Sequence, residues 1–220
     1  MSLATVTRWW WIRHAPVTGH GDRIYGQDDL PADCSDSVPF AVLAEQLPAD
    51  AVWVTSQLRR AQQTAAALHA ALRIRAGAAG GEPAAMLVEP DFAEQHFGEW
   101  QGLTRDELHR QRDGEWHRFW LAPAHEAPPG GESFAQVVER VAVAMRRLTV
   151  AHRGRDIIAI AHGGSIRGAL ALALGLDPER ALAFVIDNCS LTRLDHIDDG
   201  RDGGWRVTAV NASPGIAIRR

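Results

Sequence analysis

Two short apolar runs, one near each end of the chain, both lead directly into a histidine. The run at 6–12 contains three consecutive tryptophans and is followed by Arg13 and His14, and the run at 157–161 is followed by His162. Apolar runs of this length and composition predict buried strands. Open α/β sheets bind ligands at the carboxyl edge of their strands. Two strands that end in histidine therefore predict one site built from both ends of the chain.

Strand and helix patterns alternate along most of the chain. Strand patterns occur at 5–12, 51–55, 86–88, 156–161, 182–187, 190–195 and 205–211. Helical spacing of apolar residues occurs at 38–47, 57–72, from 104, from 133, and at 164–175. Ser56 is expected to cap the second of these helices, and capping-box patterns begin at Thr104 and Ser133. The alternation predicts an α/β fold: a three-layer sandwich with a mainly parallel central sheet and helices on both faces.

Length and composition predict one domain with an insertion. A chain of 220 residues supports one sizeable core, so residues 1–220 are expected to form a single domain. The stretch 94–131 is polar, rich in tryptophan and ends in prolines and glycines, which indicates a lid over the edge of the sheet. The spacing of four between Trp116 and Trp120 favours a helix that buries both in the core. The alternative is that they line the mouth of the site.

Charge and cysteine content narrow the classes of partner and compartment. The formal net charge is −4, whereas nucleic-acid binders are more often basic, so no nucleic-acid partner is expected. No apolar stretch reaches about 18 residues, the length needed for a transmembrane helix, so no membrane partner is expected either. Two cysteines are too few for a disulfide framework, which favours a cytoplasmic location. All 23 basic side chains are arginines, so an anion site has to use the forked guanidinium group.

Arg13 and His14 have the chemistry of a phosphoryl-transfer site. The neutral imidazole is the form that attacks phosphorus, and nearby guanidinium groups disfavour its protonated form. Arg59 and Arg60 lie at the expected start of a helix, where two cations are unfavourable unless an anionic ligand binds at the same edge. The alternatives are a structural role for His14, and a surface ion pair or a solvated helix face for the arginines.

Two further segments supply an acid and a turn that suits an oxyanion. Glu94 lies among aromatic residues, and a carboxylic acid in apolar surroundings can carry the proton that a leaving alkoxide needs. Glu99 is the competing acid on spacing alone. His162 and Gly163 stand between an expected strand and an expected helix, where glycine lets backbone amides approach an oxyanion. A tight turn for packing is the alternative.

Taken together, these segments resemble the motifs of the histidine phosphatase superfamily, also called phosphoglycerate-mutase-like. Arg-His-Ala at 13–15 is similar to the family's Arg-His-Gly signature. Residues 56–65 are similar to its Ser-Pro-Leu-x-Arg-Ala-x-x-Thr-Ala segment, and this similarity selects Arg60 over Arg59.

Three later segments extend the resemblance, which spans about 7–195. Residues 94–102 resemble the family's Glu-x-x-Phe-Gly-x-Trp-Glu-Gly segment, and this selects Glu94 over Glu99. Residues 129–133 and 161–164 match two further segments in the same order as in the family.

The resemblance implies a metal-independent reaction through a phosphohistidine, without a cofactor. It implies that His14 takes the phosphoryl group and that Arg13, Arg60 and His162 hold its oxygens. Glu94 is implied to protonate the leaving group and then to activate water. The expected partner is a small phosphorylated substrate, and the expected assembly is a monomer or a homodimer.

The loop after the signature departs from the family pattern. The family's Glu-Thr-x-x-Asn is replaced by Pro-Val-Thr at 16–18, so the contacts of that asparagine are not carried over. The run at 13–17, followed by residues 25–31, resembles the α-ribazole-phosphatase-like branch, which makes α-ribazole phosphate a candidate substrate. This adds Tyr25 and Gln27 to the expected substrate contacts, beside Gly163.

Three alternatives stay open. A phosphoglycerate mutase has to exclude water and grip a second anion, but the arginines of the lid are interleaved with acidic residues, which favours hydrolysis. A non-catalytic phospho-ligand binding module is the second alternative, although both His14 and Glu94 are present. A metal site formed by His14, His96, His162 and Glu94 is the third, and it lacks a compact ligand spacing such as HExxH.

Overall fold

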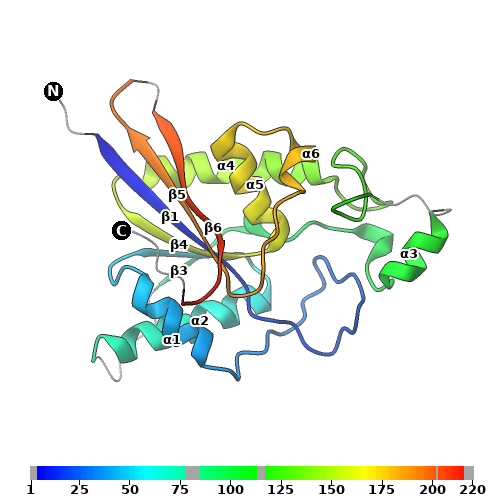
Figure 1. Cartoon of the computed structure of the whole chain (residues 1–220), viewed down its shortest axis with the longest axis horizontal. Coiled ribbons are helices and arrows are strands. Elements are labelled where there is room, and N and C mark those ends of the chain that lie inside the picture. Colours follow the sequence, from blue (N-terminus) through cyan, green and yellow to red (C-terminus); the bar gives the residue numbers. More distant parts are fainter. Residues whose placement is uncertain (1–3, 78–84, 113–116, 202, 216–220) are drawn as a thin grey trace.

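A six-stranded sheet runs through the centre of the molecule, as Figure 1 shows. The computed structural model describes residues 4–77, 85–112, 117–201 and 203–215. The strands stand in the order β3-β2-β4-β1-β5-β6. Strand β5 runs opposite to both of its neighbours and the other strands share one direction, so the sheet is mixed but mainly parallel, as predicted. The bounds are Thr5–Arg13 (β1), Val52–Thr55 (β2), Met86–Val88 (β3), Asp156–Ala161 (β4), Leu191–Asp198 (β5) and Gly204–Ala212 (β6).

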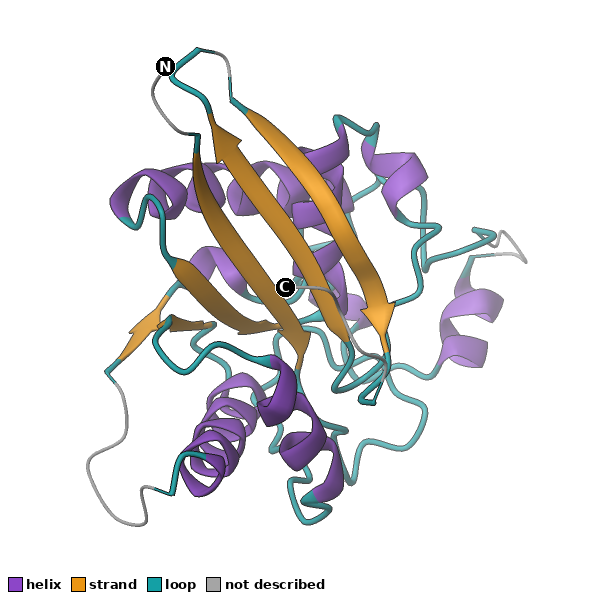
Figure 2. Ribbon diagram, turned by 60° about the vertical axis from the view of Figure 1, so that its left-hand side comes forward, coloured by secondary structure: helices purple, strands orange, loops and turns teal. Residues whose placement is uncertain are grey.

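Helices cover both faces of this sheet, which Figure 2 shows in a second view. Helices α1 and α2 pack on one face, and α4, α5 and α6 pack on the other. The predicted three-layer sandwich is therefore confirmed. The bounds are Val38–Gln46 (α1), Arg59–Arg75 (α2), Phe134–Ala151 (α4), Gly163–Leu174 (α5) and Pro178–Ala181 (α6).

The tryptophan-rich strand β1 explains why helices are needed on both faces. Trp9 and Trp11 belong to the apolar core beneath α4 and α5, and their rings stack at 5.3 Å. Trp10 and Ile12 belong to the core beneath α1 and α2. Successive residues of a strand face opposite sides, so a strand that is apolar on both sides has to be covered twice.

Two of the expected helix starts are confirmed by their caps. The Thr104 hydroxyl accepts a hydrogen bond from the Glu107 amide, and the Glu107 carboxylate accepts one from the Thr104 amide, at the start of α3 (Arg105–Gln111). Ser133 and Gln136 form the same reciprocal pair at the start of α4. Each pair satisfies backbone donors that the first turn of a helix leaves free.

Three local predictions are wrong. Ser56 does not cap α2, which begins after Leu58, because the Ser56 hydroxyl is engaged with a histidine instead. Residues 182–187 form a loop rather than a strand, and their carbonyls hydrogen-bond to arginine side chains instead of to a neighbouring strand. Trp120 lies in a bend and not on a helix, so it is not part of a helical stripe, and Trp116 lies outside the described residues.

The stretch 94–131 has a small apolar cluster of its own. It contains a short 3-10 helix (Gly98–Trp100) and α3, which Figure 1 places to the side of the sheet layers. It is tied to the loop after β1 by a backbone hydrogen bond from Ile24 to Leu103. The single domain over 1–220 and the role of 94–131 as a lid stay predictions. The buried members of the cluster are Ile24, Phe97, Trp100, Leu108, Leu121 and Ala122.

The core beneath α2 yields a stability prediction. Leu68 is fully buried against the sheet, so Leu68→Ala should lower the free energy of unfolding by about 2–5 kcal/mol. Ile74 lies on the same helix and is 77% exposed, so Ile74→Ala should change it by less than about 0.5 kcal/mol. Urea titrations followed by circular dichroism measure both. Equal losses in the two variants would contradict this packing of α2.

Candidate active site

The parallel pairing of β1 and β4 brings the two predicted histidines together. Arg13 is opposite Ala161 in the register of these strands, so His14 and His162 follow them at the same edge. Their ring centroids are 5.1 Å apart, and both side chains are fully buried. The expected convergence of the two ends of the chain is present in the structure.

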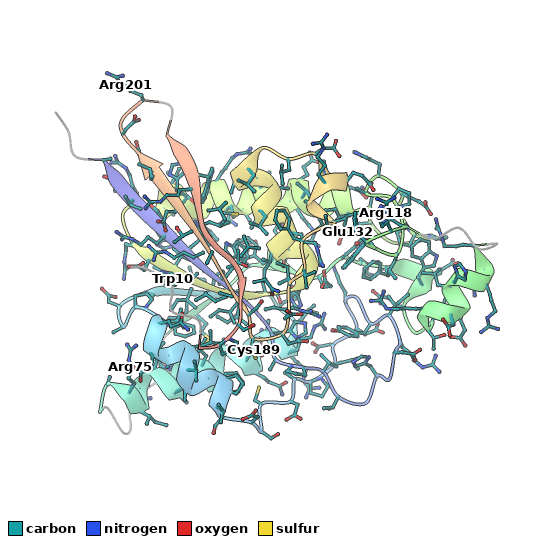
Figure 3. All side chains as sticks on the ribbon, in the orientation of Figure 1. Trp10, Arg75, Arg118, Glu132, Cys189 and Arg201 are labelled. Carbon is teal, nitrogen blue, oxygen red and sulfur yellow. The ribbon has the colours of Figure 1, made fainter. Side chains whose placement is uncertain are left out.

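Hydrogen bonds from the loop before β5 fix the turn that follows β1. The His14 amide donates to the Ala161 carbonyl at 3.0 Å, and the Cys189 amide donates to the Arg13 carbonyl at 3.0 Å. The Asn188 side chain donates to the His14 carbonyl at 2.7 Å. Cys189, labelled in Figure 3, marks this loop near the carboxyl end of β1. The turn lets Arg13 and His14 serve one site, although neighbouring residues of a straight strand would point to opposite faces.

His14 is held with one ring nitrogen occupied and the other free. Its Nδ1 lies 2.7 Å from the Ala15 carbonyl, which can only accept, so Nδ1 carries the proton. Its Nε2 is buried and has no partner among the described residues. Burial lowers the pKa of His14 well below 6.5, and the charges of Arg13 and Arg60 lower it further. The imidazole is therefore neutral at pH 7 with its lone pair on Nε2.

His162 shows the opposite arrangement, and Ser56 sets it. Ser56 Oγ lies 2.7 Å from His162 Nε2 and accepts a hydrogen bond from the Leu58 amide at 3.3 Å. The hydroxyl proton is then free to be donated to Nε2, which places the ring proton of neutral His162 on Nδ1. That Nδ1 is buried and has no partner in the described part of the chain. Burial, followed by the charges of His14 and nearby arginines, lowers the pKa of His162 well below 6.5.

Arg13 and Arg60 are anchored through backbone carbonyls only. Arg13 donates to the Ile186 carbonyl at 2.6 Å, and Arg60 donates to the carbonyls of Gly26 and Asp28. The Nε atoms of both arginines are buried without a partner among the residues described, and neither guanidinium forms an ion pair there. Arg60 is fully buried and Arg13 is half-buried, and such cations without carboxylate partners are costly unless an anion binds beside them.

Glu94 is fixed by the first turn of α5. Its Oε1 accepts hydrogen bonds from the amides of Gly164 and Gln95, both at 2.9 Å. A Cβ at residue 164 would lie 2.2 Å from that oxygen, which explains the second glycine after His162. Because Oε1 is occupied by two donors, a proton on this carboxyl group has to reside on Oε2. The expected apolar surroundings of Glu94 are thus replaced in part by backbone donors.

A cavity of about 300 Å³ opens beside these residues. Arg13, Tyr25, Glu94 and Gly163 line it, whereas the alternative acid Glu99 does not. His14, Arg60 and His162 lie behind this lining at 0% exposure. The Tyr25 ring lies 6.5 Å from the His14 ring and stacks beneath the Arg60 guanidinium at 5.0 Å. Tyr25 therefore lies beside both His14 and Arg60 at the edge of the cavity.

Gln27 supports the backbone of the site, and two further residues beside the site were not predicted. The Gln27 amide group donates to the Glu94 carbonyl at 2.8 Å, so it supports the backbone of Glu94. Its predicted role as a substrate contact stays a prediction. The missed residues are Ser56, which was read as a helix cap, and Arg167, whose charge within an otherwise apolar helix was the available signal.

The structure bears on two other classes of site. Within the described residues, no group of three or more His, Cys, Asp or Glu side chains is arranged to hold a metal ion. His96 does not join His14 and His162, since its Nδ1 accepts a hydrogen bond from the Gly98 amide in the 94–131 stretch. Among the helices described, none combines the length and the apolar character needed to cross a membrane.

The order of these groups along the chain matches a known family. The model of the histidine phosphatase superfamily (branch 1) matches residues 9–213. The chain belongs to this superfamily. It is an enzyme family that includes phosphatases, and the predicted family is confirmed.

Several of the proteins similar to this chain come from mycobacteria. The chain is 34% identical over 147 residues to the bifunctional protein Rv2228c of Mycobacterium tuberculosis, and it covers 37% of that protein. It is 32% identical to the glucosyl-3-phosphoglycerate phosphatase of Mycolicibacterium vanbaalenii, over 94% of this chain and 95% of that protein. The solved structure of the mycobacterial glucosyl-3-phosphoglycerate phosphatase Rv2419c matches with a TM-score of 0.75 and 28% identity, over 96% of this chain and 100% of that one. The α-ribazole phosphatase of Shigella flexneri, at 24% identity, a TM-score of 0.73 and coverage of 97% and 100%, shares the fold.

The two buried histidines predict how the stability of this histidine phosphatase varies with pH. Their folded-state pKa values lie well below 6.5, whereas in the unfolded chain they titrate near 6.5. Between these values the unfolded chain binds more protons, so the free energy of unfolding falls as the pH is lowered through that range. The expected slope is about 1.4 kcal/mol per pH unit for each histidine. Urea titrations from about pH 6.5 down to about pH 5.5 measure it. His14→Asn should lose its share of the slope, and a flat wild-type profile contradicts the neutral assignment.

The Ser56 hydroxyl predicts a positioning effect on His162. Ser56→Ala removes the donor that places the ring proton on Nδ1, so kcat/KM should fall about tenfold, the worth of one hydrogen bond. Ser56→Thr keeps the hydroxyl and should restore most of the activity. Nitrogen NMR of labelled protein should show the Nδ1–H form of His162 in the wild type and a mixed population in Ser56→Ala. An unchanged tautomer with reduced activity would assign Ser56 a packing role instead.

Proposed function

We propose that the chain is a phosphomonoesterase that forms a phosphohistidine on His14. The observation that supports this most strongly is a set of four buried ring and guanidinium nitrogens without partners in the described structure. Three of them are hydrogen-bond donors: Arg13 Nε, Arg60 Nε and His162 Nδ1. The fourth, His14 Nε2, carries a lone pair. Three donors around one nucleophile suit a phosphoryl group, whose oxygens accept hydrogen bonds while its phosphorus is attacked.

The first step is the transfer of the phosphoryl group to His14. Neutral Nε2 attacks phosphorus, the bond to the ester oxygen breaks, and Glu94 Oε2 gives its proton to the departing alkoxide. Arg13, Arg60 and His162 hold the phosphoryl oxygens and neutralise their charge. Donors that are fixed in advance in a buried site typically contribute about 10²–10³ each to the rate.

The second step is hydrolysis of the phosphohistidine. Glu94, now a carboxylate, takes a proton from water, and the water oxygen attacks phosphorus as the bond to Nε2 breaks. Inorganic phosphate leaves, and both Glu94 Oε2 and His14 return to their starting states. In this scheme the guanidinium groups and the imidazole stabilise the negative charge of the phosphoryl group. We therefore propose a reaction that needs neither a metal ion nor a cofactor.

Hydrolysis is favoured over a mutase reaction by the charges of the 94–131 stretch. Arg112 forms a bidentate ion pair with Glu126 and stacks over Trp100 at 5.1 Å. Glu107 lies 3.8 Å from Arg23 at the rim of the cavity. The positive charge of residues 94–131 is therefore partly neutralised by nearby carboxylates. A mutase would need that charge to hold a second anionic group.

Two substrates follow as proposals from the resemblance and the relatives. α-Ribazole phosphate is the substrate suggested by residues 25–31. Glucosyl-3-phosphoglycerate is suggested by the name of a relative that matches this chain over nearly its whole length. We also propose a cytoplasmic location, which the two free cysteines support, and a monomer or homodimer as the working assembly.

Trapping of the phosphoenzyme tests this function. Rapid acid-free quenching of the wild type with a ³²P-labelled phosphate ester should give label on the protein that is lost in acid, as expected for a phosphohistidine. His14→Ala should abolish the label and lower kcat/KM by about 10³-fold or more, because no nucleophile remains. His125→Asn, at an exposed histidine, is the matched control and should keep both.

Three outcomes overturn parts of the proposal. Full activity in His14→Ala removes the assigned nucleophile. Binding of phosphate esters without turnover makes the chain a binding module. Rapid isomerisation of 3-phosphoglycerate in the presence of its bisphosphate primer, with negligible release of phosphate, makes it a mutase.

A further inference from the structure

Arg167 is a buried cation that the steps above do not use. It lies on α5, five residues after His162, within a helix whose other side chains are small or apolar. Only 8% of its surface is exposed, and it lines the cavity beside Glu94. An arginine in such a position needs a reason, because a buried guanidinium group loses its hydration.

The contacts of Arg167 leave its outer nitrogens free. Its Nε donates to the Phe184 carbonyl at 2.8 Å, and its guanidinium plane lies over the Trp120 ring at 4.5 Å. Its Nη atoms form no hydrogen bond or ion pair with the residues described. Buried Arg193, in contrast, is paired with the Asp195 carboxylate. Burial lowers the pKa of Arg167 to about 10, so it still carries its charge at pH 7.

Gly163 shows where the free end of Arg167 points. A Cβ built on Gly163 would lie 3.0 Å from Arg167 Nη1, 3.8 Å from Glu94 Oε2 and 3.9 Å from Arg13 Nε. These three groups thus surround one small region of the cavity that the missing side chain leaves open. The region contains the acid that protonates the leaving oxygen and one of the arginines that hold the phosphoryl group.

Electrostatic coupling places Arg167 on the leaving-group side of the site. Glu94 and Arg13 both shift the pKa of Arg167. The shifts of His14 and His162 are caused instead by burial, by each other and by Arg13, Arg60 and Arg140. Together with the distances around Gly163, this indicates that Arg167 lies beside the acid.

The rest of the cavity lining sets the surroundings in which Arg167 would meet a ligand. Its walls beside Arg167 are apolar and comprise Phe97, Trp120, Leu121 and Ile186. Asp22 and Asp187 also line it, but both are exposed at the rim, and Asp187 accepts a hydrogen bond from Asn211. Arg23 and Arg105 line it as well, and both are exposed. Arg167 therefore stands among apolar groups beside Arg13, where an anion gains most from a forked guanidinium.

We infer that Arg167 is a specificity-determining residue that binds a carboxylate on the leaving alcohol of the substrate. This rests on the proposed phosphatase function and narrows its substrate class to phosphate esters of small hydroxy acids. The carboxylate is carried on a carbon close to the ester oxygen, since Arg167 and Arg13 approach the same region above Gly163. Of the two substrates proposed above, glucosyl-3-phosphoglycerate contains such a carboxylate and α-ribazole phosphate does not.

A matched pair of esters tests this role. 3-Phosphoglycerate and glycerol 3-phosphate differ in that a carboxylate replaces a hydroxymethyl group. The wild type should prefer the acid in kcat/KM, and Arg167→Gln should lower that preference by about 10- to 100-fold, the range of a charge-assisted hydrogen-bond pair. Arg167→Lys keeps the charge without the fork and should give an intermediate preference. Arg146→Gln, at an exposed arginine of α4, removes the same charge elsewhere and should keep the wild-type preference.

Binding of phosphonates gives a readout that does not depend on turnover. Calorimetry should show tighter binding of 3-phosphonopropionate than of propylphosphonate to the wild type. The difference should disappear in Arg167→Gln and persist in Arg146→Gln. Circular dichroism and the binding of propylphosphonate itself show whether Arg167→Gln is folded.

The outcomes separate this inference from the proposed function. Equal losses for both esters in Arg167→Gln would mean that Arg167 acts through packing on Trp120 or through Glu94, and an unchanged preference would mean that it binds nothing; either result overturns the inference. A wild type that hydrolyses esters but binds both phosphonates equally overturns the inference and leaves the phosphatase proposal standing. A wild type that hydrolyses no ester overturns the phosphatase proposal, and the phosphonate pair then still reports on Arg167.

Discussion

The site depends on the parallel pairing of β1 with β4. This pairing places the residues that follow two adjacent strands at one edge, so His14 and His162 meet although their positions in the chain differ by 148. The same pairing is buried on both faces by helices, and so the edge is held by the most extensive core of the molecule. Chemistry that needs two fixed imidazoles is thus supported by packing rather than by the loops alone.

Positive charge without carboxylate partners is the second organising feature. Arg13, Arg60 and Arg167 are held mainly by carbonyl oxygens, which orient a guanidinium group without cancelling its charge. The two histidines among them stay neutral, because burial and the neighbouring charges oppose protonation. An electropositive pocket around a neutral histidine, the nucleophile that we propose, is therefore built into the free protein, and it suits a ligand that carries negative charge.

Much of the fold and of the site could be predicted from the sequence, for identifiable reasons. Strand ends, capping boxes and apolar spacing are local signals, and they located β1, β4, α3, α4 and the residues at 13–14 and 162. The errors arose where a residue served a distant partner. Ser56 has the composition of a helix cap, but its hydroxyl is used by His162, which is 106 positions away. Arg167 could not be assigned, because its role depends on a cavity formed by segments that the helix itself does not specify.

The apolar composition of 182–187 predicts a strand, but these residues form a loop. Their loop conformation leaves main-chain carbonyls free to anchor arginines of the site. The carbonyl of Ile186 anchors Arg13, and the carbonyl of Phe184, two residues earlier, anchors Arg167. One short stretch of main chain therefore anchors both the arginine that we propose to bind the phosphoryl oxygens and the arginine that we propose to bind the leaving group. An insertion or deletion there would displace both arginines together, so this protein cannot readily acquire a new substrate range through that loop without also disturbing the reaction centre.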